Sequence, residues 1–356
     1  MKIGILTFHC VNNCGAVLQA YALQEFLLQL GHDVYIIDYR PSYLLKTTKL
    51  NLKKYHFIRF GKDLVKYILN TKGRFKFADF RKRYFRLYAL NFDSSNHSFD
   101  AFVFGSDQIW NKQIIGSDKI FWGNFLAADN IKLLSYAASC GGWNIADNDL
   151  SVLRRRLNAF TSISVREDFL AIALQRILNR NIDRVLDPTL LLDKSQFEKI
   201  LVPPKVMKPY IFIYEVTPEI RTIDIAQQIV QQTNKAMQII RCGAVNRQNG
   251  NLKTINNVGP LDFLGYIKNA FCIVTTSFHG TALSIAFNRN FYTIRISKSQ
   301  DERVRSLLSM LDLDNRLIDK SSTCTYTDIN YTNVNKILQK QKVKSEHFLR
   351  VGLQMK

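Results

Sequence analysis

The sequence predicts an α/β protein in which two Rossmann-like domains face a cleft. The chain has 356 residues, more than a single hydrophobic core ordinarily serves. Short apolar runs alternate with segments of helical periodicity along nearly the whole chain, a pattern typical of parallel sheets joined by crossover helices. A proline-containing stretch at residues 202–209 (VPPKVMKP) interrupts this alternation near the middle, where we place the domain boundary.

The first half of the chain opens with a β-α-β unit. Residues 2–8 (KIGILTF) form an apolar strand, and residues 15–30 carry apolar side chains at helical spacing up to Gly31, a residue type that commonly ends helices. Residues 33–38 (DVYIID) predict the next strand, which must pair in parallel with the first. Further strands are expected at 100–105, 131–137, 162–165 and 183–186, and helices at 149–160 and 167–177.

The same alternation restarts after the proline-containing stretch. Strands are expected at 209–216, 236–242, 271–274 and 290–296, and helices at 220–232, 261–269 and 301–311. We assign residues 1–202 and 203–328 to the two domains, and 329–356 to a C-terminal helix that packs back across them. This is the architecture of GT-B glycosyltransferases and their relatives.

Positive charge is concentrated in one segment of the first domain. The chain has a net charge of +20, and residues 40–90 hold 15 Lys and Arg against two acidic residues, with aromatic residues between them. We treat residues 41–92, approximately, as a basic helical insertion. It could bind nucleic acid, contact an anionic membrane surface, or simply consist of amphipathic helices with their basic sides in water.

Other features narrow the class of protein. No stretch approaches the roughly 20 apolar residues of a membrane span, and the N-terminus enters a strand directly, so we expect a cytoplasmic protein. Cys10 and Cys14 have no second cysteine pair, so we expect free thiols and no metal. The loop at 9–15 (HCVNNCG) lacks the G-x-G-x-x-G pattern, so no dinucleotide cofactor is expected.

Four polar loops follow predicted strands in otherwise apolar surroundings. Because the carboxyl ends of parallel strands lie at one edge of a sheet, we expect these loops to converge on one cleft. His279 stands where a strand ends and a helix begins, a position whose free N–H groups favour an anion. The loops are 12–15 (NNCG), 105–111 (GSDQIWN), 164–168 (SVRED) and 276–280 (TSFHG).

Each loop also has a purely structural explanation. His279 could cap its own helix, Asp107 could cap a turn, and Arg166 could bridge to Glu167 or Asp168 on the surface. The coincidence of four such loops at strand ends outweighs any one of them, so a functional cleft remains the stronger interpretation.

Several motifs stand in a fixed order along the chain. Besides the start of the chain (KIGILTFHCVNNCGAVLQAYALQ), they are FVFGSDQIWN at 102–111, SYAASCG at 135–141, SVREDF at 164–169, VLDPTLLL at 185–192 and TSFHGTALSIAFN at 276–288. This series resembles the polysaccharide pyruvyl transferase family over nearly the whole chain. The resemblance implies a GT-B-like enzyme that moves the pyruvyl group of phosphoenolpyruvate onto a sugar and releases phosphate. The product is usually a ketal, and in bacteria the sugar often belongs to a capsule, an exopolysaccharide or a secondary wall polymer.

The resemblance also implies roles for individual residues. His279 matches the histidine proposed as catalytic or as a ligand of the donor, and Arg166 matches an arginine associated with the anionic groups of the donor. Several branches of the family carry an arginine two positions before the histidine that matches His279, where this chain has Ser277. Arg295, Lys298 and Arg303 are candidates to replace it. The predicted substrate-binding residues are Asn13, Gly15, Ser106, Asp107, Gln108, Ser277, Gly280, Lys298 and Arg303.

The residue types suit this chemistry. Phosphoenolpyruvate carries a carboxylate and a phosphate, which the planar arginine fork binds well, and a histidine can transfer protons near neutral pH. The expected partners are phosphoenolpyruvate, a glycan or lipid-linked saccharide acceptor and, through the basic insertion, an anionic membrane surface.

Two alternatives fit the sequence less well. A GT-B glycosyltransferase using a sugar nucleotide would need an acidic residue soon after His279, but Asp301 and Glu302 come beyond another strand. A nucleic-acid-binding module would leave the four loops unexplained, so no nucleic-acid partner is expected.

Overall fold

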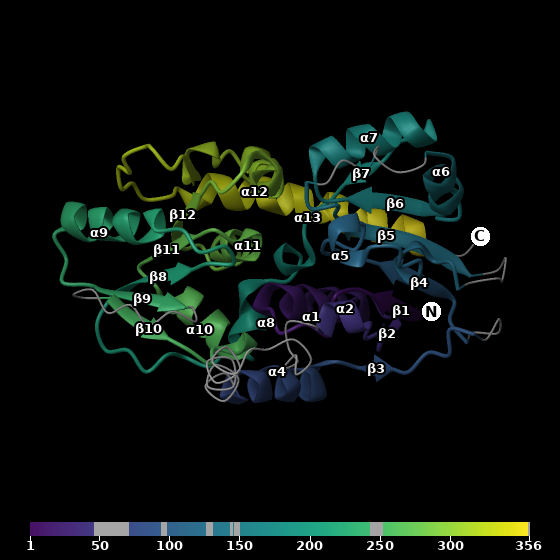
Figure 1. The fold of residues 1–356 in the computed structure, drawn as a ribbon, viewed down its shortest axis with the longest axis horizontal. Coiled ribbons are helices and arrows are strands. Elements are labelled where there is room, and N and C mark those ends of the chain that lie inside the picture. Colours follow the sequence, from purple (N-terminus) through teal and green to yellow (C-terminus); the bar gives the residue numbers. More distant parts are fainter. Residues whose placement is uncertain are drawn as a thin grey trace, which may run out of the picture.

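The computed structural model describes residues 1–45, 71–93, 98–125, 131–142, 145, 150–242 and 252–354, and for 298–300 the backbone alone. Within these residues the chain forms two parallel sheets with helices packed around them (Figure 1). In spatial order the first sheet has β3 (Leu87–Tyr88), β2 (Asp33–Ile37), β1 (Lys2–Leu6), β4 (Ala101–Phe104), β5 (Lys132–Ala138), β6 (Ser162–Val165) and β7 (Asp183–Arg184). The second has β10 (Leu252–Ile255), β9 (Gln238–Cys242), β8 (Tyr210–Tyr214), β11 (Cys272–Thr275), β12 (Asn290–Ile294) and β13 (Leu317–Ile318).

Helices connect the strands of each sheet. The first domain has α1 (Cys14–Gln29), α2 (Ser42–Leu45), α4 (Thr71–Tyr84), α5 (Lys112–Ile115), α6 (Leu150–Asn158), α7 (Asp168–Leu178) and α8 (Lys194–Glu198). The second has α9 (Arg221–Thr233), α10 (Pro260–Asn269), α11 (Phe278–Ala286), α12 (Lys298–Met310) and the long α13 (Tyr331–Leu353). The predicted fold class, two Rossmann-like domains, is confirmed.

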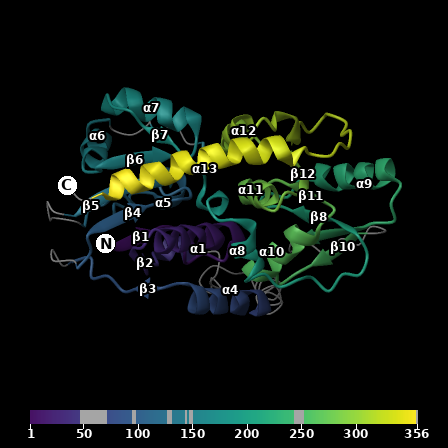
Figure 2. The ribbon, with the colours of Figure 1, turned by 180° about the vertical axis from the view of Figure 1, so that it is seen from behind.

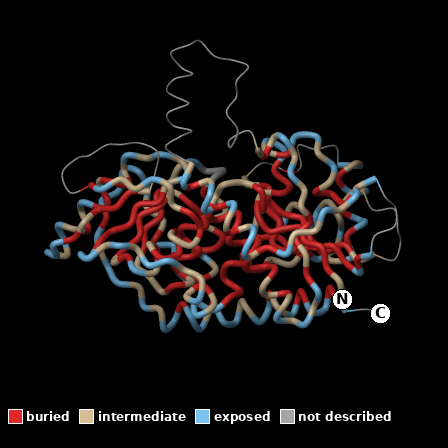
Figure 3. The backbone as a smooth tube through the Cα atoms, turned by 90° about the horizontal axis from the view of Figure 1, so that it is seen from below, coloured by how far each residue is buried: buried red, intermediate tan, exposed pale blue. Residues whose placement is uncertain are grey.

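The central strands are apolar because both of their faces are covered. Ile3 and Ile5 of β1 and Ile211 and Ile213 of β8 are completely buried, as parallel strands between helical layers require. In Figure 3 the buried backbone, in red, gathers in two groups that correspond to the two sheets. One core cluster runs through both domains, since α1 packs against α10.

Two helices join the domains outside the sheets. Figure 2 shows α13 running across both halves of the molecule. Near its start Tyr331 donates a hydrogen bond to the carbonyl of Arg289 (2.6 Å), and near its end Gly352 lies against Leu134 of β5. On another side, Lys76 of α4 forms a 2.8 Å ion pair with Asp262 of α10.

The structure departs from the sequence prediction in the shortest elements. The basic insertion is not wholly helical, because β3 is the edge strand of the first sheet; residues 46–70 of the insertion lie outside the described residues. We did not expect β3, β10 or β13 from the sequence, since two to four residues are too few to show a period. Among the described helices, none is long and apolar enough to cross a lipid bilayer.

Candidate active site

The space between the domains lies where both sheets reverse their strand order. In the first sheet β1 and β4 are neighbours, and in the second β8 and β11 are neighbours. Open parallel sheets bind ligands beyond the carboxyl ends of such strands, because the connections diverge to opposite faces and leave a crevice. The loops after β1, β4 and β11 are three of the four polar loops identified in the sequence.

A cavity of about 330 Å³ occupies this crevice and is lined by residues of both domains. Its volume lies within the range of small-molecule sites, roughly 300–1,000 Å³. The first domain adds apolar and aromatic side chains such as Phe8 and Tyr43 to the wall. Of the predicted site residues, Asn13, Asp107, Gln108, Ser277, His279 and Arg303 line the cavity.

Two helix N-termini, one from each domain, meet at this cavity. Asn13 caps α1, and its Oδ1 accepts a hydrogen bond from the amide of Ala16 (3.1 Å). Ser277 caps α11, and its Oγ accepts from the amide of Gly280 (3.3 Å). Helix N-termini carry partial positive charge and free N–H groups, so the convergence of two of them favours an anionic ligand.

The imidazole of His279 lies directly against Gly15 across the domain boundary. A Cβ atom on Gly15 would stand 2.2 Å from His279 Nδ1 and 2.4 Å from its Cγ. Any larger residue at position 15 would therefore overlap the ring. This close approach explains the glycine in the first turn of α1, where glycine is otherwise unfavourable.

A buried aspartate behind the cavity binds several of the predicted site residues. Asp187 follows β7 and is 1% exposed. Its Oδ2 accepts hydrogen bonds from Arg166 Nη1 (2.8 Å) and Ser106 Oγ (3.1 Å). His279 Nε2 lies 3.6 Å from the same oxygen. Asp187 was not among the predicted site residues, because an aspartate before Pro188 is also typical of an ordinary turn.

Electrostatics keep the Asp187 carboxylate ionised. Burial alone raises the pKa of Asp187, but the neighbouring His279 and Arg166 and a hydrogen bond from Thr189 together lower it well below its usual range. Glu167 behaves differently, since burial raises its pKa despite the adjacent Arg166. Asp187 therefore carries negative charge beside His279 and Arg166.

Arg166 lies behind the cavity wall. The residue is 3% exposed, its Nε lies 3.4 Å from Glu167 Oε1, and its guanidinium stacks 4.1 Å from the ring centre of Phe278. Its Nη2 has no hydrogen-bond partner among the described residues. The alternative of a bridge to Glu167 has the correct partner but not the correct place, because Arg166 is buried and also binds Asp187. Its predicted role as donor clamp stays a prediction.

Arg303 of α12 brings a cationic side chain to the cavity. Burial and the nearby Arg166 lower the pKa of Arg303, and its Nε has no hydrogen-bond partner within the described part of the chain. Arg295 instead lies 3.1 Å from Asp319 in an ion pair. The side chain of Lys298 lies outside the described residues. Of the two candidates whose side chains the structure describes, Arg303 lines the cavity and Arg295 does not.

The loop after β4 contributes the remaining predicted residues. Asp107 Oδ1 accepts a hydrogen bond from the Gln108 amide (2.8 Å), and Gln108 Oε1 accepts from Asn111 Nδ2 (2.8 Å). These bonds hold the loop in shape, while Asp107 and Gln108 also face the cavity. Ser106 does not face it and binds Asp187 instead.

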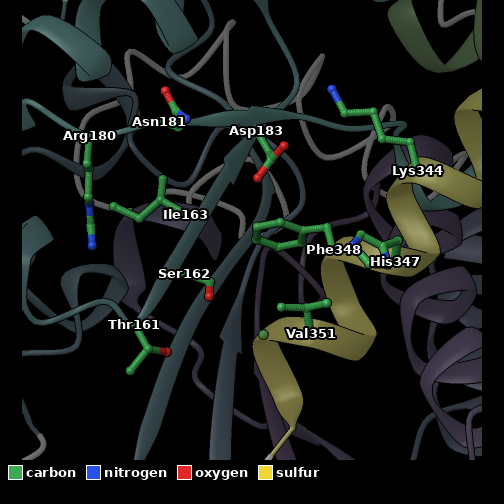
Figure 4. Close-up of a pocket in the computed structure, with 11 residues that line it drawn as sticks. Thr161, Ser162, Ile163, Arg180, Asn181, Asp183, Lys344, His347, Phe348 and Val351 are labelled. Atoms are coloured by element: carbon green, nitrogen blue, oxygen red, sulfur yellow. The ribbon is translucent and has the colours of Figure 1, made fainter.

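A second cavity, of about 310 Å³, lies at the opposite edge of the first sheet. Figure 4 shows Ser162 and Asp183 at the starts of strands facing Lys344 and His347 of α13. None of the predicted site residues lines this second cavity, and it does not lie at the carboxyl end of a strand. Over the ranges the structure describes, no group of three or more His, Cys, Asp or Glu side chains could hold a metal ion. The cavity of about 330 Å³ that six predicted site residues line is therefore the candidate active site.

A model of the polysaccharide pyruvyl transferase family matches residues 13–298, most of the chain. The chain belongs to this family. The matched region contains Asn13, Arg166, Asp187 and His279, whereas Arg303 lies beyond it. No curated protein matches the chain in sequence.

Solved structures of similar fold support the GT-B arrangement. A putative UDP-N-acetylglucosamine 2-epimerase from Listeria monocytogenes is 9% identical with a TM-score of 0.50, over 99% of this chain and 91% of that chain. Arabidopsis thaliana UGT89C1 is 10% identical, also with a TM-score of 0.50, over 99% of both chains. At these identities the likeness concerns the fold alone.

Proposed function

We propose that this polysaccharide pyruvyl transferase takes the pyruvyl group from phosphoenolpyruvate and places it on a sugar as a ketal. The supporting observation is that His279, Arg303 and two helix N-termini converge on one cavity between the domains. Phosphoenolpyruvate carries a phosphate and a carboxylate, and positive groups of this kind stabilise both. An imidazole at the same wall supplies the acid or base that the reaction needs.

The transfer requires one addition of a hydroxyl and one displacement of phosphate by a second hydroxyl, both at the same carbon. The first sugar hydroxyl forms a C–O bond to C2 of phosphoenolpyruvate while C3 gains a proton and becomes a methyl group. The second hydroxyl then attacks C2, and the C–O bond to phosphate breaks with its electron pair leaving on phosphate. His279 relays the proton from the first hydroxyl to C3, and the proton of the second hydroxyl leaves with phosphate.

The acceptor is a glycan or its lipid-linked precursor, and we propose that α4 holds the enzyme against an anionic membrane surface. Its outward side carries Lys72, Lys82 and Phe75, and Phe75 is 71% exposed. Basic side chains near such a surface contribute about 1 kcal/mol each. Sedimentation with anionic vesicles at low salt tests this contact, and Phe75→Ala with Lys82→Ala should weaken it. Absence of binding by the native protein would rule it out.

Turnover with phosphoenolpyruvate and candidate glycans tests the reaction directly, by phosphate release and a gain of pyruvyl mass on the glycan. His279→Ala should lower the rate by on the order of 10²–10⁴-fold, the contribution of a positioned general acid or base. Arg166→Ala should lower it as well if Arg166 acts on the donor. Turnover of a sugar nucleotide in place of phosphoenolpyruvate would support the glycosyltransferase alternative. Near-normal turnover by His279→Ala would remove His279 from the chemistry.

A further inference from the structure

We propose that Asp187 is the positioning residue of the transfer reaction, orienting the His279 imidazole across the domain boundary and stabilising its protonated form. This inference rests on the proposed function and adds a residue to it. Asp187 does not line the cavity, so it acts through His279 rather than on the substrate.

The two carboxylate oxygens of Asp187 contact different groups. Oδ1 accepts hydrogen bonds from the amide (3.0 Å) and the hydroxyl (2.7 Å) of Thr189, which fix the turn that follows β7. Oδ2 faces Arg166, Ser106 and His279. One oxygen thus anchors the carboxylate locally, and the other is directed toward the candidate catalytic histidine.

The backbone that presents Asp187 is held from two further elements. The carbonyl of Leu186 accepts a hydrogen bond from the Tyr136 hydroxyl of β5 (2.9 Å), and its amide donates to Ser345 Oγ of α13 (3.0 Å). Pro188 then restricts the backbone on the other side. An orienting group must itself be held rigidly, and these contacts satisfy that requirement.

This arrangement assigns the two ring nitrogens of His279. Nε2 faces Asp187, so Nδ1, which lies over Gly15, exchanges the proton with substrate. When the ring takes up a proton, the charge faces an ionised carboxylate, and the proton stays on the imidazole because the pKa of Asp187 is held well below its usual range. Arg166 and Tyr136 also interact with Asp187, and Arg166 interacts in turn with Glu167, Asp107 and Arg303.

Asp187→Asn tests the proposal, because asparagine keeps the shape and removes the charge. We expect kcat to fall by on the order of 10²–10⁴-fold, with a much smaller change in KM for phosphoenolpyruvate. The limb of the pH–rate profile that reports the imidazole should move to lower pH. Thr189→Val is the graded comparison: it removes the hydroxyl bond to Oδ1 but leaves the charge of Asp187, so the pH–rate profile should move less than in Asp187→Asn.

A second measurement is independent of turnover. NMR of the histidine ring protons, with the His279 signal identified by its loss in His279→Ala, should show His279 titrating at lower pH in Asp187→Asn than in the native protein. An unchanged titration in folded Asp187→Asn would overturn the proposal whether or not phosphoenolpyruvate is the donor. A shifted titration in a protein that does not turn over phosphoenolpyruvate would keep Asp187 as the orienting group and reject the proposed function instead.

Discussion

Gly15→Ala should sharply lower the activity of the enzyme by displacing the His279 imidazole, while every native side chain is kept. The added Cβ would stand 2.2 Å from His279 Nδ1, 2.4 Å from its Cγ and 2.6 Å from its Cβ. Cβ atoms essentially never approach other atoms within 3.0 Å, so the ring or the start of α1 must move. All three nearest atoms belong to His279, which makes the effect specific to the imidazole.

The size of the effect follows from the overlap. Relieving it requires a shift of roughly 1 Å, and misplacing a catalytic group by about 1 Å costs on the order of 10²-fold in rate. Alanine in a helix is more stable than glycine by roughly 0.5–1 kcal/mol, whereas forced overlap in a packed interior destabilises by about 1–3 kcal/mol. We therefore expect a large loss of kcat and a net loss of stability.

Making Gly15→Ala in a His279→Gly variant separates the overlap with the imidazole from the general effect of alanine on helix stability. In His279→Gly the imidazole and its Cβ are gone, so Gly15→Ala should stabilise the protein, as ordinary helix propensity requires. Steady-state kinetics and thermal unfolding of the single and double variants measure the two effects. Native kcat in Gly15→Ala, with the same change in Tm in both backgrounds, would refute the placement of the ring over Gly15.

Three further predictions concern the same site. Arg303→Ala should raise KM for phosphoenolpyruvate by on the order of 10–10²-fold, since a hydrogen bond to a charged group contributes roughly 1.5–3 kcal/mol; Arg303→Lys is the matched variant in initial-rate kinetics. Because the pKa of Asp187 is lowered in the folded state, its contribution to stability is fully present above about pH 4 and is lost as the pH falls further. Urea unfolding of Asp187→Asn should accordingly depend less on pH in that acidic range than unfolding of the native protein. Activity should survive dialysis against a chelator, and loss restored by a divalent metal would contradict the reaction scheme.

The sequence was sufficient to locate the cleft because the turn from a strand to a helix has a recognisable pattern of residues. The turn after β1 and the turn after β11 each combine an apolar run, a capping residue and a helical pattern. Rossmann-like connectivity then places such turns at one edge of each sheet. Five predicted residues line the cavity for this reason, although they lie on loops far apart in the chain: Asn13, Asp107, Gln108, Ser277 and His279.

The sequence was insufficient where packing between distant segments decides the position of a side chain or the formation of a strand. Arg166 and Asp187 are 21 positions apart in the chain. No pattern in the sequence around either residue indicates that Arg166, which we predicted to bind the donor, donates a hydrogen bond to Asp187. Arg303 reaches the cavity because of how α12 packs against α11, which no residue pattern reveals. The two-residue strands β3 and β13 form only because a neighbouring strand supplies their hydrogen bonds.

The site depends on a fixed arrangement of the domains, because its central contact is divided between them. Asp187 and Gly15 belong to the first domain and His279 to the second. Domains joined by small polar interfaces move relative to each other by default, whereas a large apolar interface holds them. Here α1 packs against α10, the turn at Pro188–Leu190 packs against both α1 and α11, and one core cluster continues through both domains. The same apolar packing that stabilises the fold therefore also sets the distance between the imidazole and the carboxylate.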